Sequence, residues 1–168
     1  AIALVPDSSK ADRPLVMMWL AAGDADKADK AANALLKRRP NDDEAHVLMG
    51  AVWNVRKDAA KARASFERAL QISPTNMDAA EALSEIDLRE GKADVVRARL
   101  EGILQKDAKN LAALLALARL DLSAGRHKES IARVRRAISE NPESINALLV
   151  LAQAQLSADR KSTRLNSS

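Results

Sequence analysis

The sequence predicts an all-α chain assembled from a repeated pair of helices. Ala contributes 34 and Leu 22 of the 168 residues, and only three residues are aromatic. This abundance of strong helix formers excludes disorder, and the shortage of aromatic side chains excludes a sheet protein. Four of the five prolines fall on one grid of 34 residues: Pro6, Pro40, Pro74 and Pro142. A fixed period of this length indicates a repeat architecture.

Each period carries the start and stop signals of two helices. Ala108 occupies the remaining point of the 34-residue grid. Two positions beyond each of the five grid points stands a residue type that caps helix N-termini: Ser8, Asp42, Asn76, Asn110 and Ser144. The side-chain oxygens of such residues accept hydrogen bonds from N–H groups of the first turn. Midway between them come Gly23, Gly91 and Gly125, with Lys57 in the second period. Because glycine adopts the left-handed conformation that ends a helix, each period predicts a helix, a turn and a second helix.

These signals place the helices in order along the chain: 9–22 and 25–38, 43–56 and 59–72, 77–90 and 93–106, 111–124 and 127–140, and 145–157. Pro14 lies inside the first of them and lacks a backbone donor, so that helix is expected to begin near Asp12 or Arg13. Residues 1–6 are interpreted as the end of a preceding repeat. Residues 159–168 are interpreted as a disordered and non-native tail, such as a cloning scar. The natural protein is therefore expected to be a longer array.

The apolar positions of the second period fit two packed helices and point to a family. A 34-residue helix-turn-helix resembles the tetratricopeptide repeat (TPR) through these residues: Gly50, Trp53, Ala62, Phe66, Ala69 and Pro74. The resemblance covers 7–158, as repeats at about 9–40, 43–74, 77–108 and 111–142 and a half repeat at 145–157. It implies a right-handed superhelical solenoid of four repeats plus one helix, whose first helices line a concave groove. It also implies a non-catalytic scaffold for protein–protein interaction.

Carried onto this sequence, the groove positions that the family uses for protein or peptide ligands fall on the first helices: Arg13, Met17, Val47, Asn54, Asp78, Glu81, Glu85, Leu115, Arg119 and Gln153. Three of them, Asp78, Glu81 and Glu85, are spaced by three and four residues and so share one helix face. We expect these three carboxylates to bind a peptide with a basic centre and apolar flanks. The alternative is internal neutralisation, because Glu85 lies four residues before Arg89.

Two acids stand where the first two periods have tryptophan. Asp87 and Asp121 follow Trp19 and Trp53 on the grid. A carboxylate late in a helix opposes the helix dipole. We therefore expect both acids to have arginine partners, such as Arg97 and Arg133, and to be structural.

No pattern in the sequence indicates catalysis, a cofactor or a metal. His46 and His127 lie in different repeats and are interpreted as surface residues, and no metal-binding histidine spacing or Gly-rich phosphate loop occurs. The net charge of +4 is small, and the basic runs lack interleaved aromatic residues, which disfavours nucleic acid as a partner. No apolar run approaches the ~20 residues of a membrane helix, so direct membrane insertion of this segment is not expected.

Two further expectations concern context and association. The phrases at 83–91 and 114–122 resemble the Ala-rich repeats of large bacterial TPR proteins in PEP-CTERM/exosortase systems, which implies exopolysaccharide or protein export in the cell envelope or periplasm. The alternative is a regulatory or substrate-holding module of an enzyme whose catalytic domain lies elsewhere. On the last helix an apolar face lacks a partner helix and predicts weak self-association: Ile145, Leu148, Leu151, Ala152 and Leu156.

Overall fold

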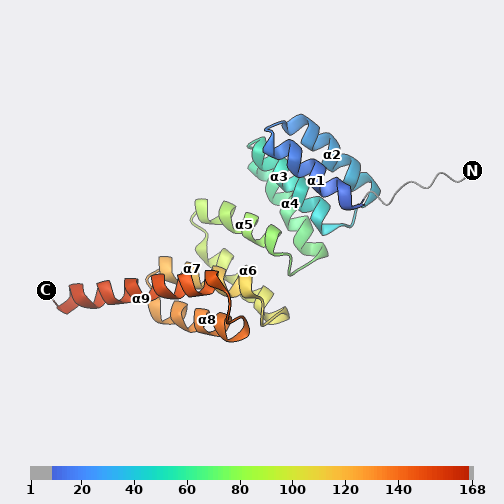
Figure 1. Cartoon of the computed structure of the whole chain (residues 1–168). Coiled ribbons are helices and arrows are strands. Elements are labelled where there is room, and N and C mark those ends of the chain that lie inside the picture. The colour runs from blue at the N-terminus through green and yellow to red at the C-terminus, as the bar shows by residue number, and fades with distance from the viewer. Residues whose placement is uncertain (1–8, 167–168) are drawn as a thin grey trace, which may run out of the picture. The chain divides into compact units, whose positions relative to one another are not determined.

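The computed structural model describes the backbone of residues 9–166 and the side chains of residues 13–159. Over that range the regular structure is helical, in nine α-helices and no strand (Figure 1): α1 Ser9–Ala21, α2 Ala25–Arg38, α3 Asp43–Val55, α4 Ala59–Ile72, α5 Met77–Arg89, α6 Ala93–Lys106, α7 Leu111–Ser123, α8 His127–Glu140 and α9 Ile145–Asn166. The bounds of α1 to α8 agree with the grid helices to within one residue. The interpretation of residues 1–6 falls outside the described residues.

The helices form two compact units, here called unit 1, which ends at Arg89, and unit 2, which begins at Glu90. In unit 1, α1 packs on α2 and α3, α2 packs on α3, and α4 packs on α3 and α5. In unit 2, α7 packs on α6, α8 and α9, and α8 packs on α9. In each unit the second helix of one repeat therefore packs on the first helix of the next, as stacked repeats require.

The predicted caps are formed. Four of the cap side chains accept hydrogen bonds from first-turn N–H groups at 2.9–3.3 Å: Asp42, Asn76, Asn110 and Ser144. The fifth, Ser8, lies outside the described residues. Each such bond satisfies a donor that the helix itself leaves without a partner. The caps thus explain why the first helices of successive repeats begin at the same point of the 34-residue period.

The first two repeats share a second capping device that sequence reasoning missed. Asp24 caps α2 and accepts a hydrogen bond from the Lys27 N–H at 3.0 Å, while the Lys27 ammonium lies 4.4 Å from the centre of the Trp19 ring. One period later Asp58, Lys61 and Trp53 repeat this arrangement, and the ammonium lies 4.3 Å from the ring centre. The signal was available, since all three residue types recur at 34-residue spacing. Each cation–π contact ties the turn to its preceding helix.

Three of the turns contain glycine in the left-handed region, as predicted, and one contains lysine. The φ angles of Gly23, Gly91 and Gly125 are 72°, 74° and 72°. Lys57 occupies the equivalent turn with a φ of 60°. A side chain at such an angle crowds the following carbonyl oxygen and costs about 1–2 kcal/mol relative to glycine.

Replacing Lys57 with Gly should therefore raise the free energy of unfolding by about 0.5–1 kcal/mol, after the greater entropy of the unfolded glycine chain is subtracted. Urea unfolding followed by circular dichroism checks this value. The matched control is Gly91→Ala, which should lower stability by a similar amount. Equal or lower stability of the Lys57→Gly chain would contradict the strain argument.

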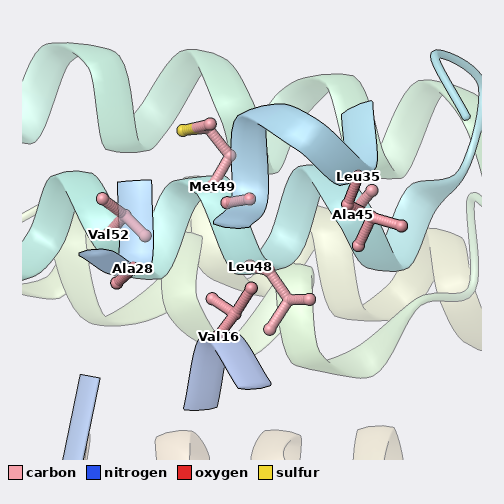
Figure 2. Packing of buried hydrophobic residues seen from close by; sticks show 8 residues of the cluster. Val16, Ala28, Leu35, Ala45, Leu48, Met49 and Val52 are labelled. Atoms are coloured by element: carbon pink, nitrogen blue, oxygen red, sulfur yellow. The ribbon is translucent and has the colours of Figure 1, made fainter. Parts of the chain in front are cut away.

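The core of unit 1 lies between α1, α2 and α3 (Figure 2). Val16 of α1, Ala28 and Leu35 of α2, and Leu48 and Val52 of α3 are all buried there. A neighbouring cluster centres on Phe66 of α4 and extends to α5. The apolar residues spaced three and four apart along these helices are therefore the residues that form the core, as expected from that spacing.

Phe66 packs directly over a glycine. A Cβ atom added to Gly50 would lie 2.4 Å from the nearest Phe66 ring atom, which is shorter than the van der Waals contact distance of two carbon atoms. The sequence-based pairing of this part of α3 with α4 is confirmed, because Gly50, Ala62, Phe66 and Ala69 are all buried. A side chain at position 50 would separate the two helices.

Both ends of the helical region differ from expectation. The helix α1 starts at Ser9 and contains Pro14, so the predicted start near Asp12 or Arg13 is wrong. Pro14 lacks a backbone N–H and so removes one hydrogen bond from α1, whereas Val16, two residues later, is buried in the core. At the other end α9 runs to Asn166, so the disordered tail is wrong for residues 159–166, whereas 167–168 lie outside the described residues. No Gly or Pro follows Pro142 to stop this helix.

Candidate functional site

Three carboxylates form an exposed line along α5, which we call the acidic stripe: Asp78, Glu81 and Glu85. The opposite side of α5 is buried in the core of unit 1 through Ala79, Ala80, Leu83 and Ile86. The alternation follows from helical spacing, which places residues three and four apart on one side. The stripe therefore faces solvent because the apolar side of the same helix is committed to the core.

Arginine from another repeat reaches one end of the stripe. Arg13 of α1 donates a hydrogen bond to Glu44 of α3, and its second terminal nitrogen lies 3.5 Å from a carboxylate oxygen of Asp78. In addition, the side chain of Asn76 donates to Asp43 at 2.7 Å. These contacts tie the starts of α1, α3 and α5 together. The basic partner of Asp78 therefore comes from α1 and not from its own helix.

The remaining carboxylates of the stripe differ in their pairing. Glu85 accepts a hydrogen bond from Arg89, which confirms the expected pair four residues apart. Glu81 forms no ion pair with any residue in the described part of the chain. Internal neutralisation is thus partial, and the unpaired carboxylate stands in the middle of the stripe.

Other residues expected at the groove are distributed unevenly. In unit 1, Met17 and Asn54 are exposed, whereas Val47 is half-buried against the cluster around Phe66. We call the exposed set of unit 1 the first-helix face: Arg13, Met17, Asn54, Asp78, Glu81 and Glu85. All of these side chains come from the first helices α1, α3 and α5.

The expectations for unit 2 hold less well. Arg119 of α7 and Gln153 of α9 are exposed. Leu115, however, is only 6% exposed and belongs to a hydrophobic cluster with Ala147 and Val150. The prediction that Leu115 lies open to a ligand is wrong, because α9 packs on α7 and covers that position.

The two acids at tryptophan positions are structural, as expected. Asp121 is completely buried and accepts hydrogen bonds from Arg97 at 2.6 Å, Arg133 at 2.7 Å and Arg126 at 3.0 Å. Burial raises the pKa of Asp121, but the hydrogen bonds from these three arginines outweigh burial and hold that pKa below its ordinary value. The site therefore holds a charged carboxylate inside unit 2.

Asp87 has an equivalent partner one repeat earlier. Arg63 of α4 lies 2.7 Å from Asp87 of α5, just as Arg97 of α6 meets Asp121 of α7. The partner Arg63 was not predicted, although Arg63 and Arg97 lie one 34-residue period apart, as do the two acids. In both places the second helix of one repeat is linked to the first helix of the next.

The described residues offer no metal centre, since no three His, Cys, Asp or Glu side chains cluster as ligands there. The Nε2 atom of His46 lies 3.0 Å from the carbonyl oxygen of Pro40 and ties down the turn before α3. His127 is half-buried, and its Nδ1 atom is buried without a hydrogen-bond partner among the described residues, so its ring is less open than the surface position that the sequence indicated. Within 9–166, none of the helices combines the length and apolarity required to cross a membrane.

Comparison with known families decides what kind of chain this is. A model of the tetratricopeptide repeat matches residues 20–76 and 115–162, and a second model of the same description matches 87–137. The chain belongs to the tetratricopeptide repeat family. TPR repeats generally mediate protein–protein interaction, and the fold is typically a non-catalytic scaffold.

Solved structures support the same fold at low sequence identity. A thermophilic TPR protein of Thermus thermophilus is 20% identical with a TM-score of 0.71, covering 90% of this TPR chain and 84% of its own. PilF of Pseudomonas aeruginosa is 15% identical with a TM-score of 0.72, covering 92% and 70%. MamA residues 41-end from Desulfovibrio magneticus RS-1 are 19% identical with a TM-score of 0.63, covering 96% and 91%. Curated protein sequences gave no match.

Proposed function

We propose that this TPR chain is a non-catalytic scaffold that binds a peptide segment of another protein on the first-helix face of unit 1. The segment has a basic centre and apolar flanks. The observation that supports this most directly is the exposed acidic stripe, at whose middle Glu81 forms no ion pair with the described residues. A ligand cation at Glu81 gains a charge-assisted hydrogen bond without displacing an ion-pair partner from residues 13–159.

The charge balance of this surface favours a basic ligand. On the first-helix face, the acids Asp78, Glu81 and Glu85 outnumber the single base Arg13, which leaves 3 − 1 = 2 uncompensated negative charges. The whole chain has the opposite sign, at +4. A basic segment is therefore attracted to this face and repelled by much of the remaining surface.

The pairs already present on the face can open at small cost. Arg13 and Asp78 are both exposed, and exposed ion pairs contribute about 0–1 kcal/mol. Asp78 can therefore exchange Arg13 for a cation of the ligand. Met17 of α1 and Leu88 of α5 are exposed apolar side chains of the same unit, 49% and 48% accessible, and supply contacts for apolar flanks.

Replacing both Asp78 and Glu81 with Ala should weaken peptide binding by at least about tenfold without lowering helicity. The measurement begins with a display library of random peptides selected on the unaltered chain. We expect the selected peptides to carry Lys or Arg at the centre with apolar neighbours. Their dissociation constants are then compared between the two chains by fluorescence anisotropy at low and high salt, because screened charges contribute less.

The matched control removes two exposed acids from the second helices of the same unit, as Asp26→Ala with Glu67→Ala. That chain loses the same charge and should keep its affinity. Selected peptides without basic residues, or equal loss of affinity in both double variants, would show that the ligand binds elsewhere.

The proposal extends to a bacterial context, a scaffold within a longer TPR array that serves exopolysaccharide or protein export in the cell envelope. Its support is the resemblance of the segments at 83–91 and 114–122 to repeats of PEP-CTERM/exosortase proteins. The full open reading frame tests it. Additional repeats and a lipoprotein signal are expected, whereas a fused catalytic domain would instead indicate the regulatory module of an enzyme.

A further inference from the structure

Two carboxylates from neighbouring first helices stand together at one end of the acidic stripe. Glu44 and Asp78 lie one 34-residue period apart, each in the first turn of its helix, α3 or α5. The side chain of Asn76 links the starts of these helices, because it accepts a hydrogen bond from the Ala79 N–H at 2.9 Å and donates one to Asp43 at 2.7 Å. The start of α5 is therefore held against the start of α3, which keeps the two carboxylates near each other.

A single guanidinium group bridges this pair of carboxylates. The Nη1 atom of Arg13 donates a hydrogen bond to Glu44, and its Nη2 atom lies 3.5 Å from a carboxylate oxygen of Asp78. A guanidinium carries its donors in a rigid planar fork, whereas the ammonium of lysine is a compact point charge on a flexible stem. Two carboxylates that face the two terminal nitrogens of one fork therefore suit arginine better than lysine.

The repeat itself does not require a cation where Arg13 stands. The equivalent residues one and two periods later are Val47 and Glu81, so neither the charge nor the size of the side chain is repeated. The side chain of Arg13 is 51% exposed, and those of Glu44 and Asp78 are 47% and 62% exposed. Ion pairs this open to water contribute little to stability. A purely structural support would gain little from such a contact, and a competing cation can open it.

We propose that Glu44 and Asp78 form an arginine subsite, in which Arg13 stands in for an arginine of the peptide ligand. The inference rests on the proposed function and specifies it, since it names arginine as the side chain that the ligand inserts at this end of the stripe. The ligand arginine displaces the guanidinium of Arg13 and takes over its contacts with both carboxylates. Arg13 is thus an internal competitor that lowers the affinity of the chain for basic peptides.

The position of the subsite also places a second cation of the ligand. Glu81 lies three residues beyond Asp78, which corresponds to about 4.5 Å along the axis of α5. Glu81 forms no ion pair with the described residues, so a basic side chain next to the ligand arginine meets an accessible carboxylate there. We therefore expect the ligand to carry an arginine beside another basic residue.

Removal of Arg13 tests the competition. The probe is a peptide with a Lys-Arg-Lys centre and leucine flanks, and its dissociation constant is measured by fluorescence anisotropy. Arg13→Gln should lower that constant by about threefold or more, because the subsite is open and one repelling charge is gone. Arg13→Lys keeps the charge but loses the fork, so it should also lower the constant, by a smaller factor. Circular dichroism should show unchanged helicity for both variants, since Arg13 is exposed.

The matched control is Lys30→Gln, which removes the same charge from an exposed residue of α2. It should change the dissociation constant by less than about twofold, because salt screens distant charges. An unchanged or higher constant for Arg13→Gln, or an equal decrease for Lys30→Gln, would overturn the competition. No decrease for Arg13→Lys would reduce the effect to net charge and overturn the role of the fork. Absence of saturable binding to every variant and to the unaltered chain would instead refute the proposed function.

Two peptides of equal charge test the preference for arginine. The second peptide has a Lys-Lys-Lys centre and the same flanks. The Arg13→Gln chain should bind the arginine peptide at least about threefold more tightly than the lysine peptide. Adding Glu44→Gln should abolish this difference, because one arm of the fork then lacks its carboxylate. Equal affinities of the Arg13→Gln chain for the two peptides, or a preference that survives Glu44→Gln, would overturn the arginine subsite while leaving peptide binding in place.

Discussion

Replacing Asp121 with Ala is expected to lower the free energy of unfolding by about 3–5 kcal/mol, because removal of one partner from a buried ion cluster leaves the others uncompensated. Asp121 is 0% exposed and binds Arg97, Arg126 and Arg133 at 2.6–3.0 Å. Without its carboxylate, three guanidinium groups would face each other with Glu101 as their remaining nearby acid. Helices α6, α7 and α8 would all lose contacts.

Chemical denaturation measures this loss, and hydrogen exchange locates it. Protection should fall first in α6, α7 and α8, whereas unit 1 should change little because repeats are coupled mainly to their neighbours. Glu143→Ala removes an exposed acid of the same unit and serves as the control, with an expected change below about 0.5 kcal/mol. A similarly small effect at Asp121 would contradict the structural role of the cluster.

The same carboxylate makes the stability of unit 2 sensitive to acid. The pKa of Asp121 in the folded chain is below its ordinary value of 3.8, so its stabilisation is fully present above pH 3.8. As pH falls through the lower folded-state pKa, the carboxylate takes up a proton and the stabilisation is lost. The unaltered chain should therefore lose stability more steeply in acid than the Asp121→Ala chain.

Replacing Gly50 with Ala is expected to destabilise unit 1 by up to about 2 kcal/mol, because overfilling a core costs about 1–3 kcal/mol and the helix propensity of alanine offsets about 1 kcal/mol. The added Cβ would lie within 2.4–2.7 Å of three Phe66 ring atoms, and Phe66 is itself buried. The ring cannot withdraw without opening the contact between α3 and α4. Thermal unfolding gives the change in stability, and hydrogen exchange should place the loss in α3, α4 and their neighbours.

Gly102→Ala is the matched control, because Gly102 is also helical and an added Cβ would meet no atom within 4 Å. Alanine there gains about 1 kcal/mol of helix propensity. The two substitutions should thus shift stability in opposite directions. A stabilising Gly50→Ala, or uniform loss of exchange protection over both units, would argue against close packing at Phe66 and against local coupling.

Much of the fold follows from local signals that need no knowledge of packing. Asp42, Asn76, Asn110 and Ser144 act as caps in the structure because capping depends only on neighbouring N–H groups. The left-handed turns are equally local, and even Lys57 adopts the conformation of the glycine it replaces. The end of α9 differs from the prediction because two local signals conflict there. The residues after 158 lack an apolar period, which predicts that the helix ends, but no Gly or Pro stops it and the helix continues.

The candidate site was predicted less completely, because side-chain pairing depends on tertiary geometry. The partner of Asp78 is Arg13, two repeats away, and helical spacing on α5 alone cannot indicate it. Arg126 reaches Asp121 because the turn at Gly125 folds α8 back along α7. Leu115 matched a groove position of the family, but its burial depends on how α9 packs on α7.

The most direct test of the proposed function is to map a bound peptide on the chain. The probe is a synthetic peptide with a Lys-Arg-Lys centre and leucine flanks, titrated into the isotope-labelled chain while backbone amide shifts are recorded by NMR. We predict that the largest changes fall on α5 near the acidic stripe and on the exposed residues of α1 and α3. Changes confined to the second helices α2 and α4, changes confined to unit 2, or no saturable changes would contradict peptide binding at the first-helix face.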